Sequence, residues 1–220
     1  MDDKVIENLR ETALGGFGAL VPIALSDAYL KNIALPSLEI KPSERKHFDK
    51  LLEKIRKTGV KVDLNKLYGP SFIPWSNKIV LNSEAVAPGV LAHEWGHALN
   101  YASLRNLGGG ALAKLWNLAY GLGKVSGLGT TAAGLTAQGL GATDDTLLNI
   151  GAAGAAIQAP MLAEEILASA RGAAKLKKLN MPGKLKAFMG VPTYMASTAL
   201  PMTPWLVRKI NKLANGIETE

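Results

Sequence analysis

The chain has 220 residues, room for one or two domains, and a mean hydropathy of +0.11. Hydrophobic residues make up 48% and charged residues 20%, which excludes a disordered or fibrous chain. The absence of cysteine excludes a disulfide scaffold, a thiolate nucleophile and any cysteine-ligated zinc or iron–sulfur site.

The net charge of +7 is concentrated toward the C-terminus. Residues 166–217 contain no acidic residue, and their nine basic residues are Arg171, Lys175, Lys177, Lys178, Lys184, Lys186, Arg208, Lys209 and Lys212. Such a stretch suits nucleic acid or an anionic lipid surface. Because no nucleic-acid recognition motif and few aromatic residues accompany it, we expect contact with lipid headgroups.

The first region, residues 1–35, is expected to form an apolar helix at a membrane surface or in a core. It starts with acidic residues, where a signal peptide would be basic. The uncharged run 12–26 includes Pro22 and has only 15 residues, too few to cross a bilayer comfortably.

The second region, residues 36–104, is expected to form a small α/β core. A helix is predicted within 36–61, ending at Gly59, because apolar residues recur at helical spacing; they are Phe48, Leu51, Leu52 and Ile55. The alternating stretch 60–64 and the extended stretch 78–81 predict two strands.

A turn is predicted between these strands at 68–70, and a second helix should begin at Pro88 and continue to about Ser103.

The third region, residues 105–163, predicts a Gly/Ala-rich helical hairpin that turns at Asp144–Asp145. Small residues recur at every fourth position, which lets helix backbones approach closely; they are Gly129, Ala133, Ala137 and Gly141, then Gly151, Ala155 and Ala159. The hairpin is expected either to contact a membrane or to pack in a protein assembly.

Two further regions complete the chain: residues 164–186, a helix from near Pro160 with a basic linker, and residues 187–220, an apolar and basic segment interrupted by prolines. The expected fold is mainly α with a small β-hairpin or sheet.

The pattern HExxH lies on the helix that begins at Pro88. His93 and His97 are four residues apart, so both imidazoles face the same way and can reach one Zn²⁺. Glu94 projects close enough to a metal-activated water to take its proton. The sequence therefore predicts a zinc hydrolase site.

Such a site needs a third protein ligand. A third histidine six residues after the second is absent, because Ser103 occupies that position. Among the later acidic residues, Asp144 and Asp145 suit a turn and the last two lie at the terminus, so Glu164 and Glu165 remain.

Glu165-Ile166-Leu167-Ala168-Ser169 resembles the Glu-x-x-Ala-Ser block of gluzincin-type metallopeptidases. The order of segments over residues 60–171 is most similar to the small membrane-embedded neutral zinc metallopeptidases of bacteria. This resemblance implies a zincin-like core with zinc bound by His93, His97 and Glu165, and with Glu94 as general base. Glu164 remains the alternative ligand.

The chain departs from that family in two respects. Its run 12–26 is a weaker anchor than the family's N-terminal membrane helix, and its helices between the two motifs contain less leucine and phenylalanine.

We therefore expect a zinc-dependent endopeptidase that acts on peptide or protein substrates at a membrane. The strand at 78–81 is expected to hold an extended substrate by backbone pairing. An oxyanion partner is needed besides zinc, and the sequence does not choose among its candidates, Tyr101, Tyr120, Tyr194 and Arg171.

The basic stretch 171–186 predicts an active site facing the cytoplasm, because cytoplasmic membrane flanks are rich in lysine and arginine. The alternative is a structural or membrane-perforating component of a phage particle or injection apparatus, located in the virion or another large complex, with an accessory or vestigial zinc site. Its basis is the marginal hydrophobicity of the Gly/Ala-rich segments and the expected lack of a signal peptide.

Overall fold

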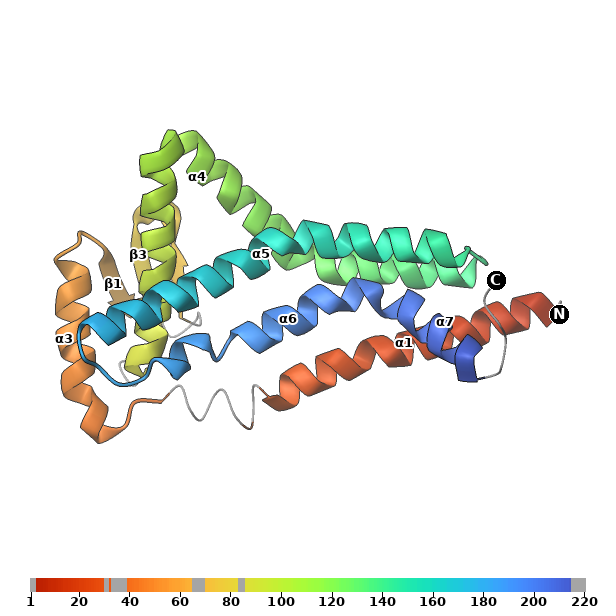
Figure 1. Cartoon of the computed structure of the whole chain (residues 1–220), viewed down its shortest axis with the longest axis horizontal. Coiled ribbons are helices and arrows are strands. Elements are labelled where there is room, and N and C mark those ends of the chain that lie inside the picture. The colour runs from red at the N-terminus through yellow and green to blue at the C-terminus, as the bar shows by residue number, and fades with distance from the viewer. Residues whose placement is uncertain (1–2, 30–31, 33–38, 65–69, 83–85, 215–220) are drawn as a thin grey trace. The chain divides into compact units, whose positions relative to one another are not determined.

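The computed structural model describes residues 3–29, 32, 39–64, 70–82 and 86–214. It is mainly helical with a small three-stranded sheet, as the sequence predicted (Figure 1). The five expected consecutive regions contribute to two compact units, each built from non-consecutive segments. We call Ala28–Asn117 with Ala163–Pro192 the sheet unit, and Met1–Asp27, Leu118–Leu162 and Thr193–Glu220 the helical unit.

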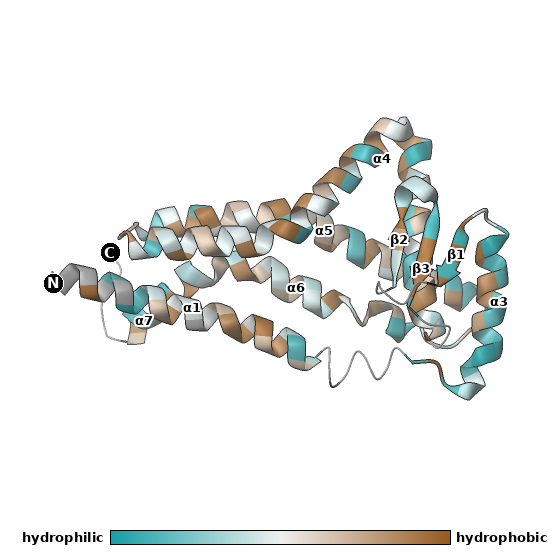
Figure 2. Cartoon of the chain, turned by 180° about the vertical axis from the view of Figure 1, so that it is seen from behind, coloured by the Kyte–Doolittle hydropathy of each residue, from teal (hydrophilic) through white to brown (hydrophobic). Residues whose placement is uncertain are grey.

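The sheet unit contains the predicted amphipathic helix, α3 (Arg45–Arg56). Phe48, Leu51 and Ile55 are buried on one face, as their spacing requires. The chain leaves the helix through Gly59, whose φ of +80° lies in the left-handed region that glycine tolerates. In Figure 2 the rest of α3 is mostly hydrophilic, which fits a helix that covers a core with one stripe.

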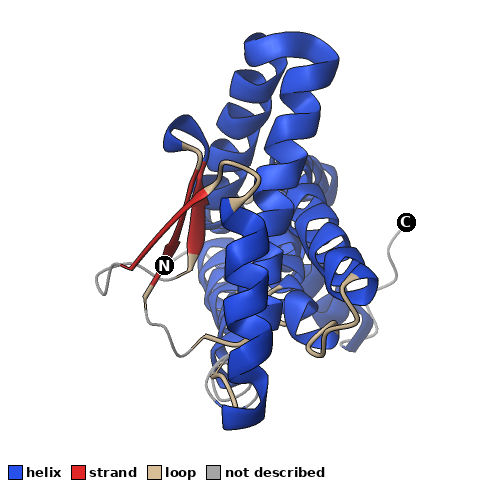
Figure 3. Ribbon diagram, turned by 90° about the vertical axis from the view of Figure 1, so that its left-hand side faces the viewer, coloured by secondary structure: helices blue, strands red, loops and turns tan. Residues whose placement is uncertain are grey.

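The sheet has the order β1-β3-β2, and Figure 3 shows the strands together against the helices. β1 (Lys61–Leu64) and β3 (Lys78–Leu81) are the two predicted strands, and they pair in parallel. The sequence analysis missed β2 (Ser71–Ile73), which pairs antiparallel to β3 and is too short for a clear alternation. Of the predicted turn at 68–70, only Pro70 lies within the described residues, in a bend.

β3 is the central strand, so the prediction that it holds a substrate by backbone pairing is wrong. Its residues pair with β1 on one side and with β2 on the other. Both edges of the strand are therefore already used. Ile79, Val80 and Leu81 are also buried, which a central strand explains and a substrate-binding edge does not.

The core of the sheet unit is built from large apolar side chains. α3, β3 and the first turns of the helix that carries HExxH meet there, together with residues after Glu165. The fully or nearly fully buried members include Phe48, Leu51, Ile55, Ile79, Leu81, Leu91, Trp95, Leu176 and Met181. The 3-10 turn at Pro42–Glu44 is tied to this unit by an ion pair of 3.1 Å between the Glu44 carboxylate and Lys186.

α4 (Pro88–Gly139) begins at the predicted proline but is much longer than predicted. Its helical geometry is broken at Gly108 and Gly109, where φ is −131° and then +67°. The bend is visible in Figure 1. The first half of α4, before the break, carries HExxH; the second half, after it, continues through Trp116.

α5 (Asp144–Lys178) is one continuous helix, so the prediction that a helix begins near Pro160 is wrong. A proline inside a helix lacks one N–H donor and its ring crowds the carbonyl four residues earlier, but α5 runs through Pro160. The predicted turn is also displaced: it occupies residues 140–143, with Gly141 at φ +80°, and Asp144 already belongs to α5. The hydroxyl of Thr143 accepts a hydrogen bond of 3.2 Å from the Thr146 N–H and so caps the helix.

The helical unit contains the later part of α4 and the first part of α5. It also contains α1 (Asp3–Tyr29) up to residue 27, most of α6 (Val191–Ala199), and α7 (Thr203–Ala214). The prolines that interrupt the C-terminal segment occupy helix starts. Pro192 and Pro204 are second residues of α6 and α7, where a missing N–H costs no intrahelical bond.

The small residues on α4 pack on a different face from the predicted stripe. Gly129 and Ala133 are exposed. The buried positions are Gly123, Gly127, Thr131, Gly134 and Gln138, spaced by four or three residues. The four-residue repeat drifts around a helix of 3.6 residues per turn, and the contacting face must alternate its spacing to stay aligned.

Candidate metal centre

The two histidines of HExxH lie side by side on the first half of α4. Their ring centroids are 4.8 Å apart and the rings are nearly perpendicular. The two Nε2 atoms are 3.2 Å apart. One turn of helix separates the residues, so both rings present the same nitrogen to one point.

A close crossing of α4 and α5 brings the carboxylates to these rings. A β-carbon at Gly96 would collide with the backbone carbonyl of Ala168, and one at Gly172 would collide with that of Ala92. The sequence analysis did not single out Gly172. With glycine at both positions the two backbones touch, and Glu165 and Ser169 reach the HExxH face.

Three potential ligand atoms form a nearly equilateral triangle. Glu165 Oε2 is 3.2 Å from His93 Nε2 and 3.6 Å from His97 Nε2, and 3.2 Å separates the two nitrogens. A tetrahedral zinc site with ligand bonds of about 2.0–2.1 Å has edges of about 3.3–3.4 Å. The three atoms therefore fit one face of such a tetrahedron and leave its fourth corner for water or substrate.

The remaining ring nitrogens are held by other side chains. His93 Nδ1 is 3.0 Å from the hydroxyl of Ser169, and His97 Nδ1 is 2.9 Å from Glu164 Oε1. An ionised carboxylate can only accept, so His97 donates through Nδ1. When the ring is neutral, as metal binding requires, this leaves the Nε2 lone pair directed toward the candidate metal position, as in metal sites whose histidines donate to a carboxylate.

Glu164, the alternative ligand, lies on the far side of His97 from the triangle. Besides His97, its carboxylate accepts hydrogen bonds from Asn100 Nδ2 at 2.9 Å and from Trp116 Nε1 at 2.8 Å. The structure thus brings Glu165 to the two Nε2 atoms and assigns Glu164 to a separate hydrogen-bond cluster. Sequence reasoning missed Asn100 and Trp116, because neither belongs to a recognisable motif.

The site holds an excess of negative charge. Burial alone would lower the pKa of His97, but hydrogen bonds to Glu164 and Glu165 and the nearby charge of Glu94 raise this pKa to about 10. Burial would raise the pKa of Glu165, yet hydrogen bonds from His93 and His97 lower it. Buried carboxylates around two imidazoles favour binding of a cation. In the metal-free site a proton on His97 supplies this positive charge, and a bound divalent metal would supply it instead.

Glu94 is buried beside the triangle, with 6% of its surface exposed. It directly follows His93, and its negative charge raises the pKa of His97. These features match the general base expected from HExxH.

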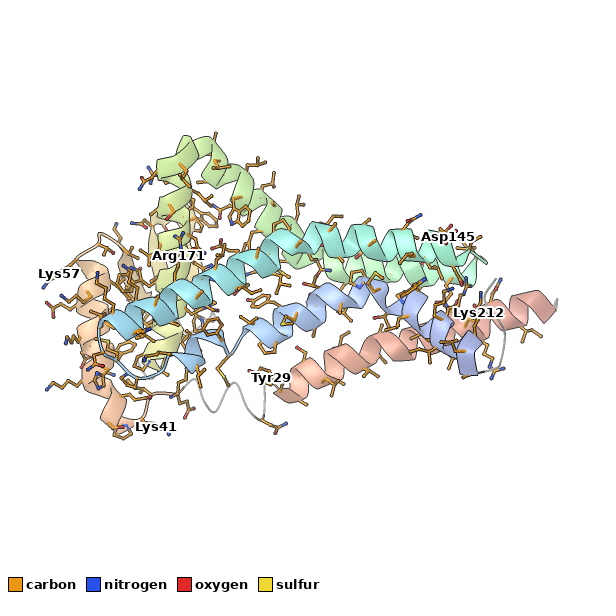
Figure 4. The ribbon with its side chains drawn as sticks, in the orientation of Figure 1. Tyr29, Lys41, Lys57, Asp145, Arg171 and Lys212 are labelled. Atoms are coloured by element: carbon orange, nitrogen blue, oxygen red, sulfur yellow. The ribbon has the colours of Figure 1, made fainter. Side chains whose placement is uncertain are left out.

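The proposed oxyanion partners differ in their surroundings. Arg171 donates hydrogen bonds to the Leu99 carbonyl at 2.8 Å and to the Ser103 hydroxyl at 2.7 Å, and so fastens α5 to α4 (Figure 4). The ring of Tyr101 lies 6.1 Å from that of Phe72 on β2. Tyr120 and Tyr194 belong to the helical unit. Of these candidates, only Tyr101 is on the first half of α4 with the histidines, one turn after His97.

No known protein family matches the chain, and no curated protein or solved structure shows significant similarity to it.

Proposed function

We propose that the protein is a zinc-dependent endopeptidase with His93, His97 and Glu165 as metal ligands. The observation that carries this proposal is the triangle of two Nε2 atoms and one carboxylate oxygen, whose edges of 3.2, 3.2 and 3.6 Å suit tetrahedral zinc. Zinc, when bound, would polarise the scissile carbonyl and lower the pKa of the attacking water.

Side chains of the protein would perform the remaining catalytic roles. Glu94 takes the proton from the attacking water and returns it to the leaving amine. Glu164 holds His97 in the tautomer that points Nε2 at the metal, and the Ser169 hydroxyl can accept from Nδ1 of His93 in the same tautomer. Tyr101, on the first half of α4, is our candidate for stabilising the oxyanion.

We assign the extended substrate to the outer edge of β2 in place of β3. In the described part of the chain, β2 pairs only with β3, which leaves its other edge for a peptide backbone. Phe72 on β2 contacts Tyr101, one turn beyond His97, so this edge lies beside the HExxH helix.

Metal content and proteolysis together test the proposal. Mass spectrometry of the purified full-length chain should find about one zinc per chain, lost in Glu165→Ala. Glu94→Gln should keep the zinc and lose about 10²–10⁴-fold in cleavage of a random peptide library. A metal-replete preparation without zinc would reject the proposal, and so would a fully active Glu94→Gln variant.

We propose further that the helical unit contacts a membrane, with the active site on the cytoplasmic side. Of the 24 exposed large hydrophobic residues among the described side chains, 16 belong to this unit. On α4 they follow one another at helical spacing: Leu118, Leu122, Val125 and Leu128. Within the described residues, α5 alone is long and apolar enough to cross a membrane, with mean hydropathy 1.3 over 18 residues, 28% of them buried.

The basic C-terminal region offers less free charge to anionic lipid than its composition indicates. Contacts within the protein engage six of its nine basic residues, which are Arg171, Lys175, Lys186, Arg208, Lys209 and Lys212. Lys177, Lys178 and Lys184 are exposed in the sheet unit and would carry the contact with anionic headgroups.

Flotation with anionic vesicles tests the membrane proposal. We expect the wild type to float with phosphatidylglycerol vesicles, and a triple change of Leu118, Leu122 and Val125 to serine to abolish flotation. The matched control changes three exposed apolar residues of the sheet unit, Leu64, Trp75 and Leu107, to serine and should still float. Equal behaviour of the two variants would favour the alternative, packing of the helical unit inside a particle such as a virion.

A further inference from the structure

Glu164 is a buried carboxylate with three hydrogen-bond donors and no place in the ligand triangle. Only 7% of its surface is exposed. Oε1 accepts from His97 Nδ1 and Asn100 Nδ2, both at 2.9 Å, and Oε2 accepts from Trp116 Nε1 at 2.8 Å. A buried charge persists only where donors compensate it, so this cluster fixes the carboxylate in one position.

The bond to His97 gives that fixed carboxylate a role at the metal position. An imidazole can rotate about its Cβ–Cγ bond, and a donor bond from Nδ1 selects both the ring orientation and the tautomer. With Nδ1 donating to Glu164, Nε2 faces His93 Nε2 and Glu165.

Trp116 reaches this cluster only because α4 is broken. It lies 19 positions after His97, which is about 28 Å along an unbroken helix. The non-helical geometry at Gly108 and Gly109 redirects the second half of α4, and the Trp116 indole comes within hydrogen-bond distance of Glu164. The placement of that second half is thereby linked to His97 through one carboxylate.

We propose that Glu164 is a positioning residue that fixes His97 for zinc, and that Trp116, by holding Glu164, makes zinc affinity depend on how the second half of α4 is placed. This inference rests on the proposed zinc site. It gives the site a point of regulation, because α4 continues after Trp116 into the helical unit. A ligand or surface that moves the second half of α4 would move Trp116 and so change how firmly Glu164 fixes the ring of His97.

Zinc affinity of the full-length protein, measured by competition with a chromophoric chelator, tests this inference. Glu164→Ala should weaken zinc binding by about 10–100-fold, and Glu164→Gln, which keeps an acceptor oxygen, should weaken it less. Trp116→Phe should cost about three- to tenfold, since Asn100 still holds the carboxylate. The visible absorption bands of the Co²⁺-substituted protein should shift in Glu164→Ala and Trp116→Phe, a change that altered stability alone would not produce.

Trp95→Phe is the matched control. Its indole is also buried in the sheet unit, but Nε1 has no hydrogen-bond partner among the described residues. We expect its zinc affinity to remain within about twofold of the wild type and its cobalt spectrum to be unchanged.

Three other results would contradict the proposed function or the inference drawn from it. A wild type without zinc affinity would reject the proposed function itself. A wild type that binds zinc, with Glu164→Ala and Trp116→Phe no weaker than Trp95→Phe, would overturn the inference and leave the function standing. Complete loss of zinc from Glu164→Ala, as expected for Glu165→Ala, would make Glu164 a ligand and overturn its positioning role.

Discussion

The two units differ in how many large apolar side chains they bury. Among the described residues, the sheet unit has 13 buried hydrophobic residues larger than alanine, from Phe48 to Met181, whereas the helical unit has three: Leu147, Met161 and Leu200. The helical unit instead buries polar groups and small residues, among them Glu11, Thr131, Gln138, Gln158, Thr203 and Arg208. Many of its other leucines are exposed, among them Leu118, Leu122 and Leu128.

The difference shows two ways of holding helices together. In the sheet unit, removing apolar surface from water stabilises the fold. In the helical unit, the helices are held instead by close approach of their backbones and by polar contacts between buried side chains. Arg208 forms an ion pair of 2.7 Å with Glu11, and Ser197 donates a hydrogen bond of 3.0 Å to Gln158. Polar and small residues in the interior, with large apolar residues on the surface, are typical of helices that face lipid. There the hydrophobic effect does not drive helices together.

The candidate metal site combines both principles. It lies in the sheet unit and is surrounded by its apolar core, yet the contact that assembles it is a glycine crossing of the kind used throughout the helical unit. Gly96 and Gly172 perform in the sheet unit the function that Gly151 and Gly154 perform in the helical unit.

The largest expected effect comes from filling that crossing. Gly96→Ala would place a methyl group against the Ala168 backbone, which cannot retract as a side chain can. We expect loss of zinc and a decrease in the free energy of unfolding of about 3 kcal/mol, measured by urea denaturation. Gly129→Ala is the control, because an added β-carbon there meets no atom within 4 Å, and it should stabilise by about 0.5–1 kcal/mol. A zinc-replete, stable Gly96→Ala protein would refute the crossing.

A more limited effect, confined to the helical unit and without loss of zinc, should follow from breaking its buried ion pair. Arg208 is 7% exposed and Glu11 10% exposed in their side chains. Arg208→Ala leaves Glu11 buried and uncompensated, so we expect unfolding free energy to fall by about 3 kcal/mol. Zinc content in the native protein should stay at the wild-type value, because no residue of this pair belongs to the metal site. Coupled loss of zinc would show that the two units do not act separately in this respect.

A third effect, confined to the metal-free protein, should appear in the pH dependence of its stability. The folded-state pKa of His97 is raised from 6.5 to about 10, so its stabilising contribution is complete below about pH 6.5 and is lost as pH rises through 10. In the helical unit, burial would raise the pKa of Asp144, but Lys209 and Lys212 lower it below 3.8; its contribution is therefore present above 3.8 and lost as pH falls below that value.

Urea denaturation of chelator-treated protein between pH 6 and pH 10 can measure the alkaline part. The wild type should lose stability across this range, and His97→Gln should lose less. Zinc must displace the proton on His97, so its apparent affinity should rise with pH over the same range. An affinity that is independent of pH would contradict the raised pKa.

The sequence by itself determined the elements with a strong local signal. The spacing of Phe48, Leu51 and Ile55 specified α3, Pro88 marked the start of α4, and HExxH placed two imidazoles on one helix face. These features depend on helical periodicity and on the missing N–H of proline, which act over a few residues. The gluzincin resemblance remains a prediction.

Tertiary structure alone decided how the distant segments meet. The choice between Glu164 and Glu165 depends on where α5 crosses α4, and adjacent residues on a helix differ by about 100° in direction. The central position of β3 depends on β2, a strand of three residues. The contact of Trp116 with Glu164 depends on the break at Gly108 and Gly109. Glycine permits such a break without specifying it, because its backbone freedom leaves the direction to packing and hydrogen bonds.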